Sequence, residues 1–136
     1  MVRPGRRQSV SRSKESNYRM VAENFYAGAE AAKAYEYWNA AGVLIVHAAI
    51  AYTDAITIKV GGVKSRGEGH METADLLKDT VELDESGLQA LQHLRRMIEQ
   101  KNLVSYSGEV YSEKDIDVLW KHLERYRYWA RRMLSQ

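Results

Sequence analysis

The stretch from residue 40 to residue 60 constrains the fold more than any other part of the chain. It reads A-A-G-V-L-I-V-H-A-A-I-A-Y-T-D-A-I-T-I-K-V and is apolar on nearly every side. A helix of this kind is either a membrane span or the central helix of a packed core. About 20 apolar residues suffice to cross a bilayer. Asp54 counts against a span, because an ionised carboxylate near mid-bilayer costs about 2.5–3.5 kcal/mol. We therefore predict the buried helix of a soluble protein, with no membrane segment.

A β-strand is the alternative for this stretch, because valine, isoleucine and threonine are frequent in it. The length without turn residues favours a helix. Gly61 and Gly62 follow directly, and glycine is the usual residue at a helix C-cap. We therefore expect one long helix that ends at the glycine pair.

The segment before it has helical spacing as well. A first long helix is predicted from about Glu15 to about Asn39, because the alanines between residues 27 and 34 favour helix. Residues 39–42 then form a kink or a short turn into the central helix.

Three further helices are predicted after the glycine pair and a polar loop. Residues 71–79 predict a short helix, and residues 84–102 a longer one whose acidic first turn suits the helix dipole. The connector 103–112 is interpreted as a loop. Ser112 and Asp115 resemble a capping box for a last helix that reaches about Leu134.

Four substantial helices and a short one, joined mostly by short loops, predict an all-α fold. The expected architecture is an antiparallel up-and-down four-helix bundle with an additional short helix. A chain of 136 residues suits a single domain, which we place at residues 15–136.

Residues 1–14 differ in composition from the rest of the chain. They contain five basic residues and no acid, whereas the remainder has 15 basic and 18 acidic residues. Because almost nothing in them is apolar, we predict a disordered basic tail. It is either an arm that contacts RNA or DNA phosphates or a solvated terminus, and the second interpretation is favoured. The domain itself is mildly acidic, so the net charge does not argue that it binds nucleic acid.

Composition also excludes several kinds of chemistry. The chain has no cysteine, which rules out disulfides, thiolate chemistry and zinc-finger sites. No apolar signal segment follows the basic N-terminus, and we expect a cytoplasmic protein. His70 and Glu72 are a weak candidate pair for a metal ion, and the histidines lack metal-site spacing. We predict no metal ion and no cofactor.

Two polar residues lie within the apolar stretch. His47 and Asp54 are seven residues apart, so they share one face of the central helix. Buried polar groups need partners. They form either a structural hydrogen-bond network, with a basic residue from a neighbouring helix, or the lining of a polar pocket. The first interpretation is favoured.

The last helix interleaves cations with aromatic side chains. These are Arg125, Arg127, Arg131 and Arg132 with Tyr126, Tyr128 and Trp129. Such a mixture suits RNA, because bases stack while phosphates are neutralised. Basic residues near a helix C-terminus are also favourable through the dipole alone, so the indication is weak.

Three segments together resemble the HEPN domain family, named for a nucleotide-binding module of higher eukaryotes and prokaryotes. They are the central A-A-G-V-L-I-V-H-A-A-I-A-Y-T-D-A, then G-E-G-H-M-E-T-A-D-L-L, and finally K-N-L-V-S-Y followed by S-E-K-D-I-D and the closing helix. The resemblance covers about residues 17–134. It implies a four-helix bundle that dimerises and often works beside a nucleotidyltransferase.

The resemblance also implies a possible activity, since many members are metal-independent ribonucleases, including toxins of toxin–antitoxin pairs. Their motif is Arg-Asn, a short gap and then His, where this chain has Lys101-Asn102 and then Tyr106. Lysine neutralises a phosphate without the bidentate fork of arginine. A phenol is a poor general base at neutral pH, where imidazole would serve.

We therefore expect a non-catalytic HEPN-like module, a homodimer, that binds a nucleotide, RNA or a protein partner such as a nucleotidyltransferase. Lys101, Asn102 and Tyr106 would line its ligand groove, with His47 and Asp54 as deeper support. The alternative is a metal-independent endoribonuclease of toxin–antitoxin type with a degenerate active site. A third possibility is a structural assembly protein whose aromatic clusters cover a dimer face.

Overall fold

The structure is a computed structural model that describes residues 7–66 and 71–136, apart from the side chains of Asn102 and Leu103. This part of the chain is mostly helical, as predicted, and contains one small two-stranded sheet that was not predicted. The elements are β1 (Arg7–Ser9), the 3-10 helix η2 (Arg12–Lys14), α1 (Glu15–Ala34), α2 (Trp38–Gly61), β2 (Val63–Ser65), α3 (Glu72–Thr80), α4 (Glu85–Glu99), α5 (Lys101–Ser105) and α6 (Glu113–Ser135).

Helix α2 is the centre of the fold, and the prediction of a helix rather than a strand is confirmed. By length and composition it could cross a membrane, yet 78% of its most apolar window is buried by other elements. Such burial is typical of a core helix. The helix ends at Gly61, and the next residue, Gly62, has a left-handed φ of 65° and donates its N–H to Ile58 O. The predicted glycine C-cap is therefore confirmed.

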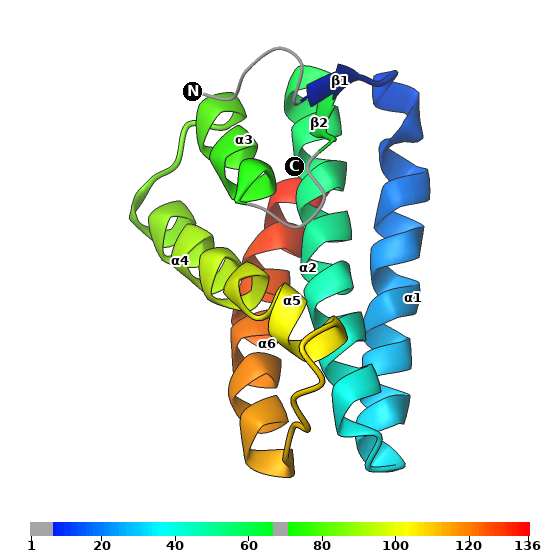
Figure 1. The fold of residues 1–136 in the computed structure, drawn as a ribbon. Coiled ribbons are helices and arrows are strands. Elements are labelled where there is room, and N and C mark those ends of the chain that lie inside the picture. The colour runs from blue at the N-terminus through cyan, green and yellow to red at the C-terminus, as the bar shows by residue number, and fades with distance from the viewer. Residues whose placement is uncertain (1–6, 67–70) are drawn as a thin grey trace.

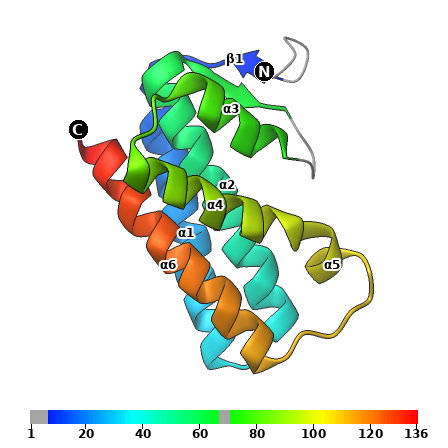
Figure 2. The same cartoon turned by 90° about the vertical axis from the view of Figure 1, so that its left-hand side faces the viewer.

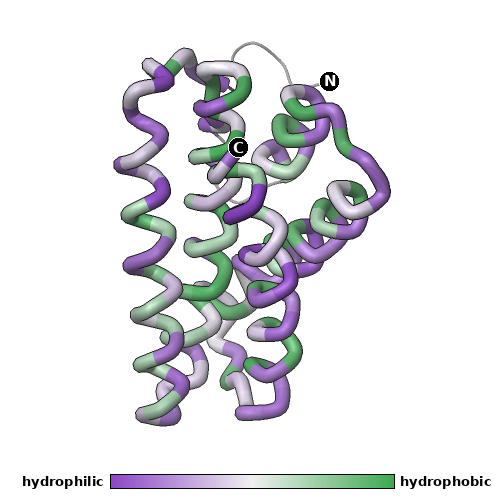
Figure 3. Tube along the Cα trace, turned by 180° about the vertical axis from the view of Figure 1, so that it is seen from behind, coloured by the Kyte–Doolittle hydropathy of each residue, from purple (hydrophilic) through white to green (hydrophobic). Residues whose placement is uncertain are grey.

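The other long helices surround α2 (Figures 1 and 2). Helix α1 packs along α2 in the opposite direction, whereas α6 lies on another side of α2 and runs in the same direction as α2. Helix α4 crosses α6 obliquely, and α3 packs against the last turns of α2. Figure 3 shows the tube of α2 as mostly white to green, while α1 and α6 carry long hydrophilic stretches.

Helix α6 packs on the core through the stripe that its sequence predicts. Ile116, Leu123 and Tyr126 are fully buried. The Tyr126 hydroxyl forms a 2.5 Å hydrogen bond with Oγ1 of Thr53 on α2. The predicted capping box is also confirmed, since Ser112 and Asp115 exchange side-chain to backbone hydrogen bonds at the start of the helix.

Helix α1 ends at Ala34, five residues before the predicted end. The chain reverses through Glu36, whose φ is 62°. The Tyr37 N–H donates to Ala32 O and the Glu36 N–H to Lys33 O, which is the pairing of a Schellman motif. Glycine usually occupies this left-handed position. Because the chain has a glutamate there, the sequence did not indicate that α1 ends at this point.

The disordered tail predicted for residues 1–14 is not what the structure has at residues 7–14. Strand β1 pairs antiparallel with β2, with Arg7 opposite Ser65. The Val10 N–H donates to Gly62 O, and Nη2 of Arg12 donates to Val60 O at the end of α2. Backbone pairing and helix capping hold this segment, although it has few apolar side chains to bury. Residues 1–6 lie outside the described part.

The connector predicted as a loop begins instead with a helical turn, α5. This turn packs on α2, where a Cβ on Gly42 would lie 2.4 Å from Cγ2 of Val104. Nδ2 of Asn39 donates to Val104 O and to Glu109 O, and the Tyr111 N–H donates back to Oδ1 of Asn39. Gly42 and Asn39 thus fix α5 and the chain after it against the start of α2.

Candidate functional site

The docking of α5 on α2 places the charge of Lys101 within electrostatic reach of His47. His47 is half-buried on α2, where its ring makes an edge contact with Phe25 of α1 at a centroid distance of 6.0 Å. Burial lowers the pKa of His47, and the positive charge of Lys101 lowers it further. The imidazole is therefore uncharged at neutral pH and lies within the electrostatic reach of the ammonium group.

Asp54 lies two helical turns further along α2, about 10 Å from His47 along the helix axis. It is 7% exposed, and its Oδ2 lies 4.0 Å from Nζ of Lys64 on β2. Burial raises the pKa of Asp54 to about 7, although the attraction of Lys64 opposes that effect. Desolvation is thus stronger here than the ion pair. The basic neighbour that the sequence predicts comes from a strand and not from a helix.

The remaining predicted site residues belong to α5 and the turn after it. Asn102 is within α5, but its side chain is outside the described part. The Tyr106 side chain is 81% exposed. The predicted set therefore divides in two: the charge of Lys101 acts on His47, whereas Asp54 has Lys64 as its charged neighbour.

An apolar surface lies around His47, and we call it the α1–α2 face. On α2 it consists of Val43, Leu44 and Ile50, which are three or four residues from His47. On α1 it consists of Phe25, which contacts His47, and of Val21 one turn before it. Val21 is 43% exposed and the others are partly buried. On the same side, a Cβ on Gly28 would meet Cδ1 of Leu44 at 3.3 Å, which shows how closely the two helices approach.

A second polar region lies between α1 and α6, and sequence analysis identified only its α6 half. It is a groove of about 610 Å³, here called the α1–α6 groove. Its lining residues are Arg19, Glu23, Glu124, Arg127, Tyr128, Arg131, Arg132, Leu134 and Ser135. The helical repeat of α6 indicated the arginines, but no local pattern indicated that α1 would face them.

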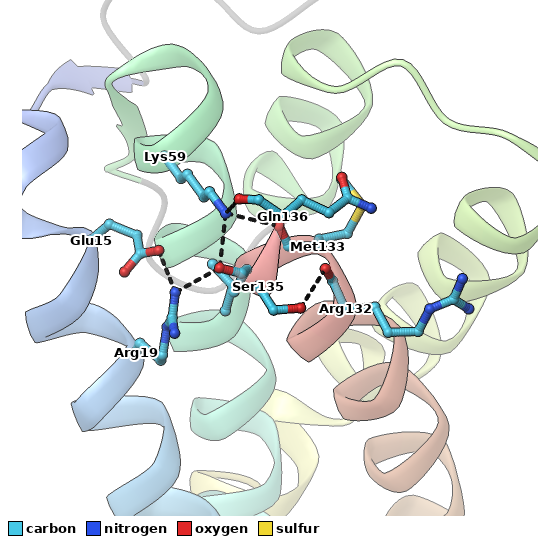
Figure 4. A network of polar contacts seen from close by, with 8 residues as sticks. Glu15, Arg19, Lys59, Arg132, Met133, Ser135 and Gln136 are labelled. Atoms are coloured by element: carbon cyan, nitrogen blue, oxygen red, sulfur yellow. Dashed lines mark hydrogen bonds and ion pairs between the residues drawn. The ribbon is translucent and has the colours of Figure 1, made fainter.

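A network of polar contacts lies at the end of α6 (Figure 4), and it shares Arg19 and Leu134 with the groove. Nη2 of Arg19 donates to Oε1 of Glu15 and to Leu134 O. Nζ of Lys59 donates to the backbone oxygens of Met133, Leu134 and Gln136. Cations from α1 and α2 therefore bind the carbonyls at the negative end of the α6 dipole.

Across residues 7–66 and 71–136, no group of three or more histidine, aspartate or glutamate side chains could hold a metal ion. His70, one of the two weak candidate ligands, lies outside the described residues. His93 and His122 form a close pair between α4 and α6.

No family model matches the chain, and no curated protein or solved structure matches it either.

Proposed function

We propose that the chain is a non-catalytic, HEPN-like helical module of the cytoplasm, and that it binds a nucleotide, an RNA or a protein partner such as a nucleotidyltransferase as a homodimer. The observation that carries this proposal is the partly exposed α1–α2 face around His47, a histidine on which the charge of Lys101 acts. The alternating directions of α1, α2, α4 and α6 in Figures 1 and 2 support an antiparallel up-and-down four-helix bundle.

The apolar character of the α1–α2 face favours a homodimer. Contiguous apolar surface on a protein marks an interaction site, and the same surface of a second copy covers it in an isologous interface. Val21 is the most accessible test position that belongs to it, since its side chain is 43% exposed. Leu88 on α4 is 48% exposed and lies outside this face, so it provides a matched control.

Sedimentation velocity tests the dimer directly. We expect the native chain and the Leu88→Glu variant to sediment as dimers and the Val21→Glu variant as a monomer, with unchanged helical circular dichroism. A native chain that remains monomeric at high micromolar concentration would remove the homodimer from the proposal.

Lys101 is the residue that would bind the ligand. Its ammonium group offers charge to a phosphate, and the uncharged ring of His47, on which that charge acts, can donate one N–H. Asn102 and Tyr106 follow Lys101 in the chain and would border the same ligand, with Asp54 as support deeper in α2. The proposal assigns binding, and not catalysis, because a tyrosine stands where the resemblance implies a histidine.

Fluorescence anisotropy with nucleotides and short RNAs in EDTA tests this assignment. We expect Lys101→Ala to weaken binding without unfolding the protein. Lys78→Ala, an exposed lysine on α3, is the charge-matched control and should bind as the native chain does. Equal affinity in the native chain and the Lys101→Ala variant would show that the ligand binds elsewhere.

A metal-independent endoribonuclease is the second candidate, and one observation favours it. Burial and Lys101 keep His47 uncharged at neutral pH, which is the state that a general base requires. Cleavage of an RNA pool in EDTA that is lost in His47→Ala and Lys101→Ala, but retained in Lys78→Ala, would establish this activity. Intact RNA in all four samples supports the non-catalytic proposal.

A further inference from the structure

The α1–α6 groove is separate from the proposed site, because neither His47 nor Lys101 lines it. Its volume of about 610 Å³ is within the range of small-molecule pockets. We propose that this groove binds the phosphate group of a small organic phosphate, with Arg131 as its principal ligand, Arg132 as a second cation and the fixed guanidinium of Arg127 as a further hydrogen-bond donor. This inference goes beyond the proposed function and does not depend on it.

Arg127 is held in one orientation by three contacts. Its Nε donates to the Tyr52 hydroxyl at 2.8 Å, its Nη2 donates to Oε1 of Glu23 at 2.8 Å, and its guanidinium carbon lies 3.8 Å from the centre of the Tyr26 ring. The Tyr52 hydroxyl in turn donates to Oε2 of Glu23. A guanidinium fixed in this way loses little conformational entropy when it binds an anion.

The same contacts keep Arg127 and Glu23 charged. Burial opposes the charge of Arg127, but its bonds to Glu23 and Tyr52 outweigh burial and raise its pKa. Burial also opposes the charge of Glu23, whereas Arg127 and Tyr52 lower its pKa. Glu23 is therefore a structural anion already satisfied by its neighbours.

Arg131 lies one helical turn after Arg127, on the same face of α6. It lines the groove together with Glu23 of α1, and its charge contributes to the lowered pKa of that carboxylate. Within the described part of the chain, no carboxylate forms an ion pair with Arg131. Its positive charge is left for a ligand.

Arg19 lines the groove from α1. Its Nη2 is used by Glu15 and Leu134 O, but its Nε is buried and lacks an acceptor among the described residues. A buried donor without an acceptor is costly. Because this Nε has almost no accessible surface, Arg19 meets the groove through its other side-chain atoms.

The charge balance selects a small phosphate over a polymer. Four arginines and two glutamates line the groove. Glu23 is paired with Arg127, and Glu124 accepts a hydrogen bond from the Tyr26 hydroxyl at 2.5 Å. Arg19 is paired with Glu15, so Arg131 and Arg132 leave one positive charge in excess of Glu124. This excess suits a single phosphate group, whereas the two carboxylates repel a longer phosphate chain. Tyr128 is 70% exposed at the rim and offers a ring surface to the organic part of the ligand.

Isothermal titration calorimetry at physiological salt tests the proposal with the full chain. The probes are inorganic phosphate, ribose 5-phosphate and adenosine 5′-monophosphate, with ribose and adenosine as unphosphorylated controls. We expect the phosphorylated probes alone to bind. Arg131→Ala should weaken binding about tenfold or more, since it removes a charged hydrogen-bonding partner. Arg131→Lys should weaken it less, because it keeps the charge and loses only the fork.

Arg96→Ala is the matched control, because Arg96 is an exposed arginine on α4 that lines a different cavity. It should bind as the native chain does. The proposal is overturned by phosphorylated probes that do not bind, by equal losses in Arg131→Ala and Arg96→Ala, or by binding of RNA oligonucleotides alone. Circular dichroism of each variant confirms that the comparison is between folded proteins.

Discussion

The Nδ1 atoms of His93 on α4 and His122 on α6 lie 2.9 Å apart, so a hydrogen bond between two imidazole rings joins the helices. One ring must donate and the other accept, which requires that at least one be neutral. Burial lowers the pKa of both rings. The charges of His122 and Arg125 lower that of His93 further, and those of Arg96 and Arg125 lower that of His122.

This pair should make the stability of the protein sensitive to acid. The unfolded histidines bind protons near their ordinary pKa of 6.5, and the folded ones only at lower pH. We therefore expect the free energy of unfolding to fall as pH drops below about 6.5. Urea unfolding between pH 5 and pH 8 measures this fall, which should be shallower in the His93→Gln/His122→Gln variant. Gln92→Ala, on an exposed neighbour, should keep the native slope.

Asp54 should have the opposite pH dependence. Its folded pKa of about 7 lies above the ordinary value of 3.8, so the folded state binds a proton more tightly than the unfolded state. Its ionisation thus lowers the free energy of unfolding as pH rises from about 4 to 7, by up to about 4 kcal/mol in total.

Asp54→Asn should therefore unfold at a higher urea concentration than the native chain at pH 8, with a smaller difference at pH 4. Asp75→Asn is a more exposed control, and a lower midpoint for Asp54→Asn at pH 8 would contradict the dominance of burial.

Glu36→Gly should stabilise the protein. Glu36 has a φ of 62° at the end of α1, where glycine has no steric cost. We expect a gain of about 0.5–1 kcal/mol in the free energy of unfolding, measured by urea denaturation. Glu30→Gly, in the exposed interior of the same helix, should instead cost about 1 kcal/mol. A loss in both variants would show that the turn does not hold Glu36 in the left-handed region.

Gly42→Ala should displace α5 from α2. The new Cβ would lie 2.4 Å from Cγ2 of Val104, and overpacking of this kind costs about 1–3 kcal/mol. Gly28→Ala, whose Cβ would meet Leu44 at 3.3 Å, should cost less. The Gly42→Ala/Val104→Ala double variant removes the clashing atom, so its measured stability should be higher than the sum of the two single effects predicts. Strict additivity of the two changes would count against the close contact.

Local patterns predicted most of the helices and some of their ends. The apolar run of α2, the glycine after it and the Ser112–Asp115 box act within a few residues of one another, so they can be read along the chain. The end of α1 could not be read in this way. Its Schellman motif uses Glu36 in place of glycine, and the tertiary structure holds that residue in a left-handed conformation.

The candidate sites depended on contacts between distant segments. His47 and Asp54 were singled out as polar residues in an apolar helix, but the neighbours of each come from α5 and β2, which no periodicity places beside α2. The predicted disorder of residues 7–14 was wrong for a similar reason. Their strand pairs with Val63–Ser65, more than 50 residues away in the chain.

The sequence by itself determined that the chain is helical, that α2 is its buried centre and that the cations of α6 follow one another along a helix. Only the tertiary structure decided which charges meet. Hydrophobic periodicity specifies the face that each helix buries, because burial depends on a residue's own chemistry. The effect of Lys101 on His47, and the pairing of Arg127 with Glu23 and Tyr52, depend on how those faces pack together, since each requires a partner within hydrogen-bond or electrostatic distance.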